Sequence, residues 1–450
     1  MFEALLFLAV AIALVGLLCA LDGSRDVFHP LVFIAPMLAF LYGWMPWKLF
    51  SNGAFAQFLD NDQLTHVQTL NLLGMLAFVG ACLAAGVRLR NQRRAEVRTL
   101  SAMACRRLLF GAAIAGGVGL LCWSITIINV GGFVHAYSSS YAGGWDDSGY
   151  IRDGSLLLLT GVLLAISALS AGGPRFPGLV LIGLFGLPWI SQALLTARRG
   201  PTFAFVLIVL MGWYINRRKR PPIFAVGTLG VCLGWLVLFL VTNRSNIYLG
   251  SSFEVTTDVG NIVDQADTGN EYIYGAGTVL SAERRDHYFW MRRYLAQILV
   301  RPIPSAVWPT KYEDFGVPEL LHNGGTGEGF GDALGWVGAD GSAPGIVADL
   351  FVELWWFAIP AMAALGWIYG MVWKRAVTRG GPWSSQYVIL SALSIYLVMQ
   401  TMEAVIFRSL LLSIPCWITW RWALRAPASL SRPVLRTRPS TLPFGATRRA

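Results

Sequence analysis

Residues 2–21 read FEALLFLAVAIALVGLLCAL, an apolar run with one charged side chain, Glu3. About 20 apolar residues are long enough to cross the hydrocarbon core of a bilayer as an α-helix. No basic residue precedes the run and no convincing small-residue cleavage site follows it, so we expect a retained membrane helix and not a signal peptide. Similar runs recur along the chain, and the first one therefore predicts the fold class of the whole protein.

Apolar residues make up 55% of the 450 residues and charged residues only 13%, which excludes an ordinary soluble domain. We predict an all-α, polytopic helical membrane protein with about eleven transmembrane helices. The predicted spans are residues 2–21, 28–45, 67–86, 108–130, 154–172, 178–195, 201–215, 222–242, 343–373, 385–407 and 409–424. The ninth is long enough to contain a tilted or broken helix around Pro360. The six cysteines lie in or at the ends of apolar runs without metal or disulfide spacing, so we expect packing residues and neither a metal site nor a cofactor.

The basic residues indicate how the chain is oriented. If the arginine-rich connection 88–107 faces the cytoplasm, the short loops and the tail on that side hold 23 Lys and Arg residues, whereas the opposite short loops hold five. Short cytoplasmic loops of membrane proteins carry such an excess. We attribute the net charge of +10 to this orientation and expect no nucleic-acid partner.

The spans divide the chain into four parts. Residues 1–242 are predicted to form N-terminal transmembrane helices, 243–342 a large periplasmic loop with short amphipathic helices, and 343–424 C-terminal transmembrane helices. The basic tail 425–450 is predicted to be disordered at the cytoplasmic surface. The loop is the only predicted soluble part large enough to carry a site.

Arg198 and Arg199 lie in a short loop on the outer side, where basic residues are rare. A pair that departs from the charge rule suggests an anionic group to be held there. Phosphate is the obvious candidate, because the guanidinium fork makes bidentate, charge-assisted hydrogen bonds to phosphate oxygens. Alternatively, one of three acids in the predicted spans, Asp349, Glu353 or Glu403, neutralises the pair and leaves it structural.

A second arginine cluster lies in the loop, within residues 282–295. We expect this segment to be one helix on the outer surface, with Arg285 and Arg292 within about 20° of each other. Tyr288, Trp290, Tyr294 and Leu295 suit the headgroup layer. The arginines would then face phosphate, or they would bind lipid headgroups or pair with Glu283 and Asp286.

Two further loop segments are unusual. Three prolines in residues 302–309 forbid a regular helix around Trp308, which would serve as a sugar-stacking wall or lie in a rigid connector. The glycine-rich run from Asn323 to Asp332 follows no predicted strand and carries no phosphate-loop lysine. We expect a mobile flap over a cleft there, or a plain flexible loop.

These features resemble the Wzy-type polymerases of O-antigen and other repeat-unit polysaccharides, part of a polymerase and ligase superfamily. The resemblance rests on the Arg198-Arg199-Gly200 step, the large outer loop, the segment 302–311 with its Pro-x-Pro-x-x-x-Trp-Pro-x-Lys pattern, and Gly341-Ser342 before an acidic, aromatic-rich span. It covers roughly residues 190–375. His322-Asn323 resembles a pair in O-antigen ligases, but it lies farther from the next span than in those enzymes, which favours a polymerase.

The resemblance implies a GT-C-like glycosyltransferase in the bacterial inner membrane with its active site facing the periplasm. Such an enzyme joins oligosaccharide repeats carried on undecaprenyl pyrophosphate, for O-antigen, capsule or exopolysaccharide. Its partners would be the lipid-linked oligosaccharide, membrane lipids and a chain-length regulator. A ligase-type transferase and a lipid-linked oligosaccharide flippase or transporter are the alternatives.

The roles that follow are expectations. Six arginines would bind pyrophosphate, namely Arg198, Arg199, Arg284, Arg285, Arg292 and Arg293. The catalytic candidates are His287, Glu328 and Asp332 as general bases and Glu353 as a positioning group. Tyr288 and Trp308 would contact the sugar.

Overall fold

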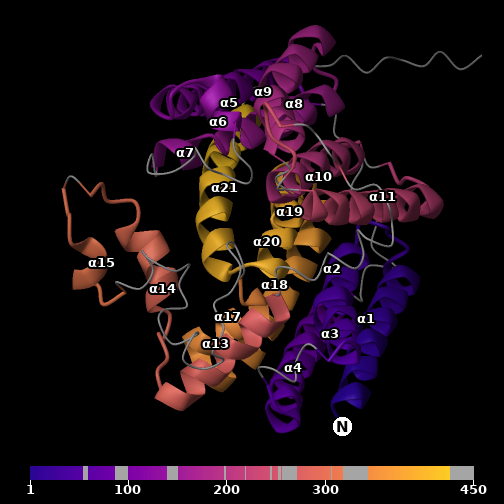
Figure 1. The fold of residues 1–450 in the computed structure, drawn as a ribbon. Helices are drawn as coiled ribbons and strands as arrows, with labels where there is room; N and C mark the ends of the chain where they lie inside the picture. The colour runs from indigo at the N-terminus through magenta and orange to yellow at the C-terminus, as the bar shows by residue number, and fades with distance from the viewer. Residues whose placement is uncertain are drawn as a thin grey trace, which may run out of the picture.

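A computed structural model describes residues 1–53, 59–86, 100–138, 150–196, 199–217, 219–243, 246–251, 255, 271–305, 307–317 and 343–425. All regular structure in these residues is helical (Figure 1). The N-terminal helices are α1 (Phe2–Ser24), α2 (Pro30–Ala39), η1 (Phe40–Trp44), α3 (Met45–Ser51), α4 (Asn61–Gly86), α5 (Ala102–Asn129), α6 (Phe133–Tyr137), α7 (Tyr150–Gly154), α8 (Leu157–Ser170), α9 (Arg175–Thr196), α10 (Arg199–Asn216) and α11 (Ile223–Thr242). The later ones are α13 (Glu271–Arg285), α14 (Arg292–Leu295), η4 (Ala296–Val300), α15 (Lys311–Asp314), α17 (Gly345–Leu354), η6 (Trp355–Phe357), α18 (Ala358–Thr378), α19 (Pro382–Ala392), α20 (Ser394–Met399) and α21 (Met402–Leu424).

Nine helical stretches in the described residues are long and apolar enough to cross a membrane. They are Phe2–Ser24, Pro30–Ser51, Asn61–Gly86, Ala102–Asn129, Ile151–Ser170, Arg175–Thr196, Ile223–Leu240, Gly345–Thr378 and Met402–Leu424. The chain is thus a multi-pass helical membrane protein. Two predicted spans fall outside this set, because α10 is shorter and the stretch α19–α20 is interrupted.

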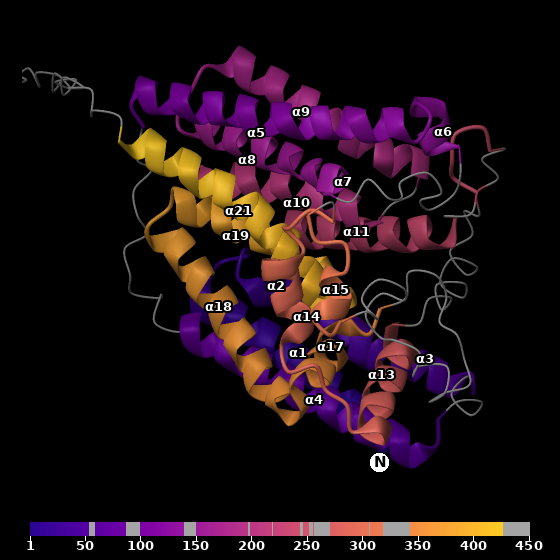
Figure 2. The ribbon, with the colours of Figure 1, turned by 90° about the vertical axis from the view of Figure 1, so that its left-hand side faces the viewer.

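The long helices form two groups. Helices α1, α2, α4 and α18 pack together, as do α5, α8, α9 and α21, and α10 and α19 connect the groups (Figures 1 and 2). Glycines allow the closest approaches: a Cβ at Gly366 of α18 would lie 2.1 Å from the carbonyl oxygen of Phe78 on α4. Small residues at helix contacts bring backbones together, as is usual in membranes.

The ends that carry the basic segments meet on one side of the bundle. Arg220 pairs with Asp26 at 2.6 Å, and the Arg107 guanidinium donates to the carbonyl oxygen of Trp422 at 2.9 Å. The Arg375 guanidinium lies 4.5 Å from the centre of the Trp383 ring. The basic segments that the structure describes, around Arg107, Arg220 and Arg375, therefore lie on one side of the bundle, while the compartment that this side faces stays a prediction.

The ninth predicted span is not a single crossing. Trp355 has a φ of 52° and ends α17, and the chain then turns into α18. A Cβ at Gly74, in the middle of α4, would contact both Val347 and Met362, although these residues are 15 positions apart. The chain therefore doubles back at Trp355, and α17 is a half-helix that reaches the middle of the bundle. The break lies before Pro360, which falls in the first turn of α18, where proline is tolerated.

The boundary between the last two predicted spans also differs. The prediction placed it near 408, whereas α20 ends at Met399 and α21 begins at Met402. Thr401 caps α21, since its hydroxyl accepts from the Ala404 amide at 3.5 Å. The break falls at the polar residues Gln400, Thr401 and Glu403, which the prediction had included in the span 385–407.

The prediction of one helix over 282–295 was wrong. Helix α13 ends at Arg285, Asp286 has a φ of 47°, and α14 begins only at Arg292. Trp290 and Met291 also have positive φ, at 51° and 69°. Arg285 and Arg292 therefore lie on different helices and do not share one helical face.

Candidate functional site

Arg293 is the centre of a buried polar cluster. It stands in the first turn of α14, and its side chain has no exposed surface, whereas its neighbour Arg292 is exposed. The left-handed backbone of Met291 re-aims the chain so that Arg293 points inward. An arginine is buried only when its charge is compensated, so its partners define the site.

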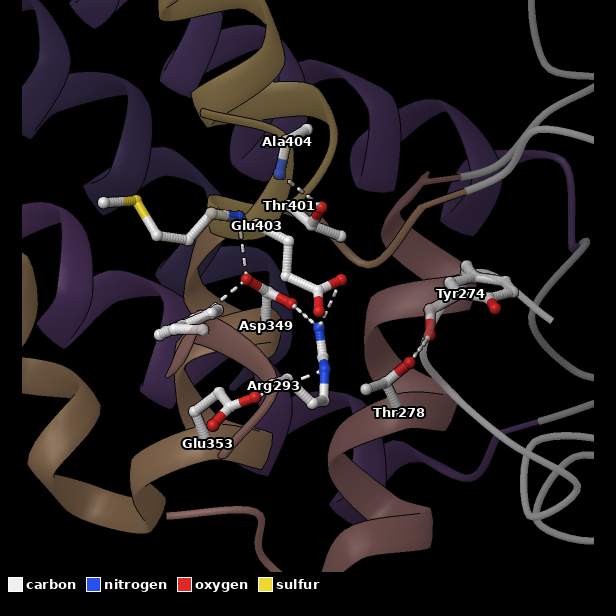
Figure 3. A network of polar contacts seen from close by, with 10 residues as sticks. Tyr274, Thr278, Arg293, Asp349, Glu353, Thr401, Glu403 and Ala404 are labelled. Carbon is white, nitrogen blue, oxygen red and sulfur yellow. Dashed lines mark hydrogen bonds and ion pairs between the residues drawn. The ribbon is translucent and has the colours of Figure 1, made fainter. Parts of the chain in front are cut away.

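Three carboxylates surround the Arg293 guanidinium (Figure 3). Nη2 lies 2.6 Å from Asp349 Oδ1 and 3.4 Å from Glu403 Oε2, and Nε lies 3.2 Å from Glu353 Oε1. Asp349 and Glu353 are four residues apart on one face of α17. Burial lowers the pKa of Arg293, but the three carboxylates more than offset this and raise it above its usual value, so the guanidinium stays charged.

Asp349 joins three elements. Its Oδ2 accepts from the Tyr294 hydroxyl at 2.6 Å and from the Met402 amide at 2.8 Å. The latter bond places a negative charge at the N-terminus of α21, where the helix dipole favours it. Burial and the neighbouring carboxylate raise the pKa of Tyr294 well above its usual value, so the hydroxyl remains a donor. Asp349 thus fixes α14 and α17 to the break between α20 and α21.

The cluster contains more carboxylate oxygens than there are protein donors to hydrogen-bond them. Glu353 Oε1 and Oε2, Glu403 Oε1 and Arg293 Nη1 have no hydrogen-bond partner of good geometry among the described residues. The Gln297 amide and the Met291 backbone amide lie beside the two glutamates. Three carboxylates around one guanidinium leave an excess of negative charge, which burial makes costly unless protons or a cation compensate it.

A second group of contacts lies where Gly200, at the start of α10, meets α20. A Cβ at Gly200 would lie 2.6 Å from the Tyr396 hydroxyl oxygen, so only glycine allows α10 to begin so close to α20. The Arg408 guanidinium lies 4.3 Å from the centre of the Tyr396 ring. Arg408 has no carboxylate within ion-pair distance among the described residues. The Arg408 guanidinium and the helix N-terminus of α10, which carries a partial positive charge, therefore form a cationic junction at Tyr396.

The residues between α14 and α15 are tied to the membrane helices near this junction. Arg301 pairs with Asp153, donates to Gln297 Oε1 at 2.7 Å, and its guanidinium lies 4.1 Å from the centre of the Phe407 ring. The segment 292–301 is thus held against the first turns of α21. Figure 2 shows α14 beside α21 and α13 lying across the direction of the long helices.

A third contact joins α13 to α4. His66 Nε2 lies 2.9 Å from Glu283 Oε1, and both side chains are partly exposed. The His66 ring lies beside Trp356, which packs against Phe351, and Phe351 packs against Tyr288. A half-exposed acid–base pair therefore borders an aromatic cluster where α17 turns into α18.

The predicted site residues fall in different places. Arg284 and Arg285 are exposed at the end of α13, His287 is exposed in the turn that follows, and Arg292 is exposed at the start of α14. The His287 ring packs edge-on against Phe289. Tyr288 lies in the aromatic cluster.

Trp308 donates to Asp314 Oδ2 at 2.6 Å, and the buried Lys311 donates to the carbonyl oxygen of Ile303 at 2.5 Å. The proline-rich segment is therefore held by its own hydrogen bonds. Four predicted positions cannot be placed as side chains: Arg198, Glu328 and Asp332 lie outside the described residues, and Arg199 is described only as the first residue of α10.

Among the described side chains, the three membrane carboxylates gather around Arg293, and pairing with Arg199 is outside what the structure describes. Arg293 is thus engaged, and its geometry favours support of the loop over direct phosphate binding. Glu353 contacts Nε of Arg293, and its role as a positioning group stays a prediction.

Sequence reasoning missed three groups of the site. His66 lies at the start of α4 in a polar stretch before the predicted span, and nothing in its spacing linked it to Glu283. Tyr294 was assigned to the headgroup layer but is buried on Asp349. Arg408 is one of the five basic residues of the outer short loops and received no role in the prediction, although an arginine five residues after Glu403 in an apolar stretch is a functional signal.

Comparisons with family models, curated proteins and solved structures found no match. The chemistry of the site therefore rests on its residues alone. The cationic junction can bind an anion at a helix N-terminus. The carboxylate cluster can accept protons or hydrogen bonds.

Proposed function

We propose that this protein is a membrane glycosyltransferase that polymerises oligosaccharide repeat units carried on a polyprenyl pyrophosphate. The observation that carries the proposal is the junction of Gly200, Tyr396 and Arg408. At this junction the start of α10, where we predict anion binding, lies near Arg408. Arg408 has no carboxylate partner among the described residues. Arg408 and the N-terminus of α10, which come from distant parts of the chain, thus lie at the same tyrosine.

The reaction requires such a site. An acceptor hydroxyl attacks the anomeric carbon of the donor sugar, the bond between that carbon and the pyrophosphate oxygen breaks, and the electron pair passes to the pyrophosphate. Fixed guanidinium groups and helix N–H groups stabilise the charge that develops on this leaving group. Arg199 and Arg408 would contact the pyrophosphate, and Arg284, Arg285 and Arg292 are further cations on the same loop-bearing side.

The remaining roles are part of the same proposal. Glu353 would position the loop through Arg293, and Tyr288 would contact sugar from the aromatic cluster. His287, Glu328 and Asp332 remain the proposed proton acceptors. The active site would face the periplasm of a bacterial inner membrane, with a chain-length regulator as a protein partner and no cofactor.

The test uses the donor that the host itself makes. A strain lacking this protein should accumulate its lipid-linked repeat, which can be extracted and supplied to purified protein in liposomes. We expect longer glycans on gels and release of polyprenyl pyrophosphate. Arg408→Ala should lower the rate about 10- to 100-fold, the loss of one or more charge-assisted hydrogen bonds. Arg379→Ala, an exposed arginine at the opposite end, should leave the rate unchanged.

A wild-type protein that releases no polyprenyl pyrophosphate from this donor would refute the proposal. A ligase would transfer the glycan to a different lipid or to a protein, so no glycan would lengthen when the lipid-linked repeat is the sole acceptor.

A transporter of lipid-linked oligosaccharide is the second candidate, and one observation favours it. The half-helix α17 and the break between α20 and α21 meet at buried carboxylates, and interrupted helices with buried charges are typical of transporters. In the same liposomes a transporter would move the donor between leaflets and leave its glycosidic bonds intact.

A further inference from the structure

We propose that the helical segment Arg292–Val300 lies in the membrane itself, with one face against the acyl chains of the leaflet at which α21 begins. The partner of this surface is the lipid bilayer. The inference is independent of the proposed function, because it concerns how a segment outside the nine membrane stretches is placed.

The segment has two contrasting faces. Leu295, Ile298 and Leu299 expose large apolar side chains, as does Met291 just before the segment. The other face carries Arg293, Tyr294, Gln297 and Val300, all buried against the protein. A water-facing helix shows the opposite pattern, with polar groups outside. Exposed apolar residues gathered on one face mark a contact with a partner or a membrane.

The exposed face continues an apolar surface of α21. That helix exposes Leu410, Ile414 and Ile418 at spacings of four residues, as expected of a stripe that faces lipid. Segment 292–300 is attached to the first turns of the same helix, since Arg301 lies on the Phe407 ring and Arg293 on Glu403. One apolar surface therefore extends from α21 onto the segment.

The length of α21 indicates how deep in the membrane the segment 292–300 lies. Its 23 residues span about 35 Å, slightly more than the roughly 30 Å hydrocarbon core. The first turns of α21 thus lie at the edge of the core, and the attached segment lies at the same level. Arg292, exposed beside the apolar face, can extend its guanidinium to the headgroups while its stem stays among the chains.

In this placement the segment 292–300 separates the Arg293 cluster from the lipid. Arg293 and Tyr294 face the carboxylates from the same segment whose opposite face touches lipid. A lipid-borne molecule that moves within the membrane plane would meet this segment before it reaches the break between α20 and α21.

Spin-label accessibility tests the proposal with controls from the same chain. Single cysteines would replace Leu299, Val307 and Ile418, which are 57%, 75% and 63% exposed, in a variant whose exposed Cys19 and Cys232 are changed to alanine. Ile418 reports on a lipid-facing span. Val307 is equally apolar but lies in the proline-rich segment beyond Arg301.

In liposomes of phosphatidylethanolamine and phosphatidylglycerol, we expect the Leu299→Cys label to collide with oxygen in preference to a water-soluble nickel complex, as the Ile418→Cys label does. The Val307→Cys label should show the reverse preference. A Leu299→Cys label that prefers the nickel complex to the extent seen at 307 would overturn the proposal. Leu295→Cys repeats the measurement one turn earlier, so that a single perturbed variant does not decide the result.

Discussion

The guanidinium of Arg293 and the carboxylate of Asp349 lie 2.6 Å apart, and neither side chain has any exposed surface. Because both charges are buried, removing one strands the other in a low-dielectric environment. We expect Asp349→Ala to destabilise the protein by about 3–5 kcal/mol, the usual effect of breaking a buried ion pair. Loss of the Met402 amide bond adds to this effect.

Thermal unfolding in detergent measures this change, and Arg292→Ala is the control. Arg292 is next in sequence to Arg293 but exposed, so its removal should change stability by less than about 0.5 kcal/mol. Equal melting temperatures for Asp349→Ala and Arg292→Ala would show that the buried cluster does not hold the loop.

Gly200 provides a test of the junction between α10 and α20. Gly200→Ala would place a Cβ 2.6 Å from the Tyr396 hydroxyl oxygen and 2.8 Å from Cζ, so α10 or the ring must shift. We expect lower stability and a lower rate of pyrophosphate release, because Arg408 rests on that ring. The matched control is Gly227→Ala in α11, where no atom lies within 4 Å and alanine favours the helix.

The double variant Gly200→Ala/Tyr396→Leu separates the contact from a general effect of the substitution. Removing the ring should restore part of the stability but not the rate. If Gly200→Ala alone melts like Gly227→Ala, α10 does not begin against Tyr396.

His66 and Glu283 form a pair that is partly exposed, in contrast to the buried pair of Arg293 and Asp349. Solvent screens such a pair, so we expect a coupling energy below about 1 kcal/mol from the double-mutant cycle of His66→Ala and Glu283→Ala. The coupling should also fall as salt is raised. A coupling as large as that of Arg293 with Asp349 would mean that the pair is desolvated in the working protein.

Asp314 predicts a local pH dependence. Hydrogen bonds from Trp308 and then Thr310 hold the pKa of Asp314 below its usual value, although the group is exposed. A lowered pKa in the folded state means that the charged form stabilises the turn above the ordinary pKa of about 4 and that this contribution is lost as pH falls through the lowered value. The turn 308–314 should therefore loosen only in acid.

The indole N–H resonance of Trp308 reports this change, and Trp308→Phe assigns it. We expect the resonance to move as the pH falls below about 4, and the Asp314→Asn variant to show no such movement. A titration that persists in Asp314→Asn would assign the change to another group.

Hydropathy and charge predicted the helical class, because apolar runs of membrane length need no tertiary information. They also grouped the basic ends, which the Asp26–Arg220 contact brings to one side. The breaks at Trp355 and at Thr401 escaped prediction. Neither position is a glycine or a proline, and the polar residues Gln400, Thr401 and Glu403 were too few to divide the predicted span 385–407. Helical periodicity does not reveal the reversal at Trp355 either. Its evidence is that Val347 and Met362 both pack against Gly74 of α4, a contact between residues far apart in the sequence.

The site was predicted only in part. Asp349, Glu353 and Glu403 were candidates because an unpaired charge is costly inside a membrane. Their partner was not predictable: Arg292 and Arg293 are adjacent and chemically identical, and only the left-handed turn at Trp290 and Met291 decides which one is buried. A helix-based expectation instead paired Arg285 with Arg292.

The central claim is that the protein transfers sugar from a lipid pyrophosphate, and the most direct measurement is the fate of the donor in liposomes that contain only purified protein and the lipid-linked repeat from a strain lacking it. We predict that glycans lengthen while polyprenyl pyrophosphate appears, at a rate reduced at least about tenfold by Arg408→Ala and unaffected by Arg379→Ala. A donor that changes leaflet but keeps its glycosidic bonds would contradict the account.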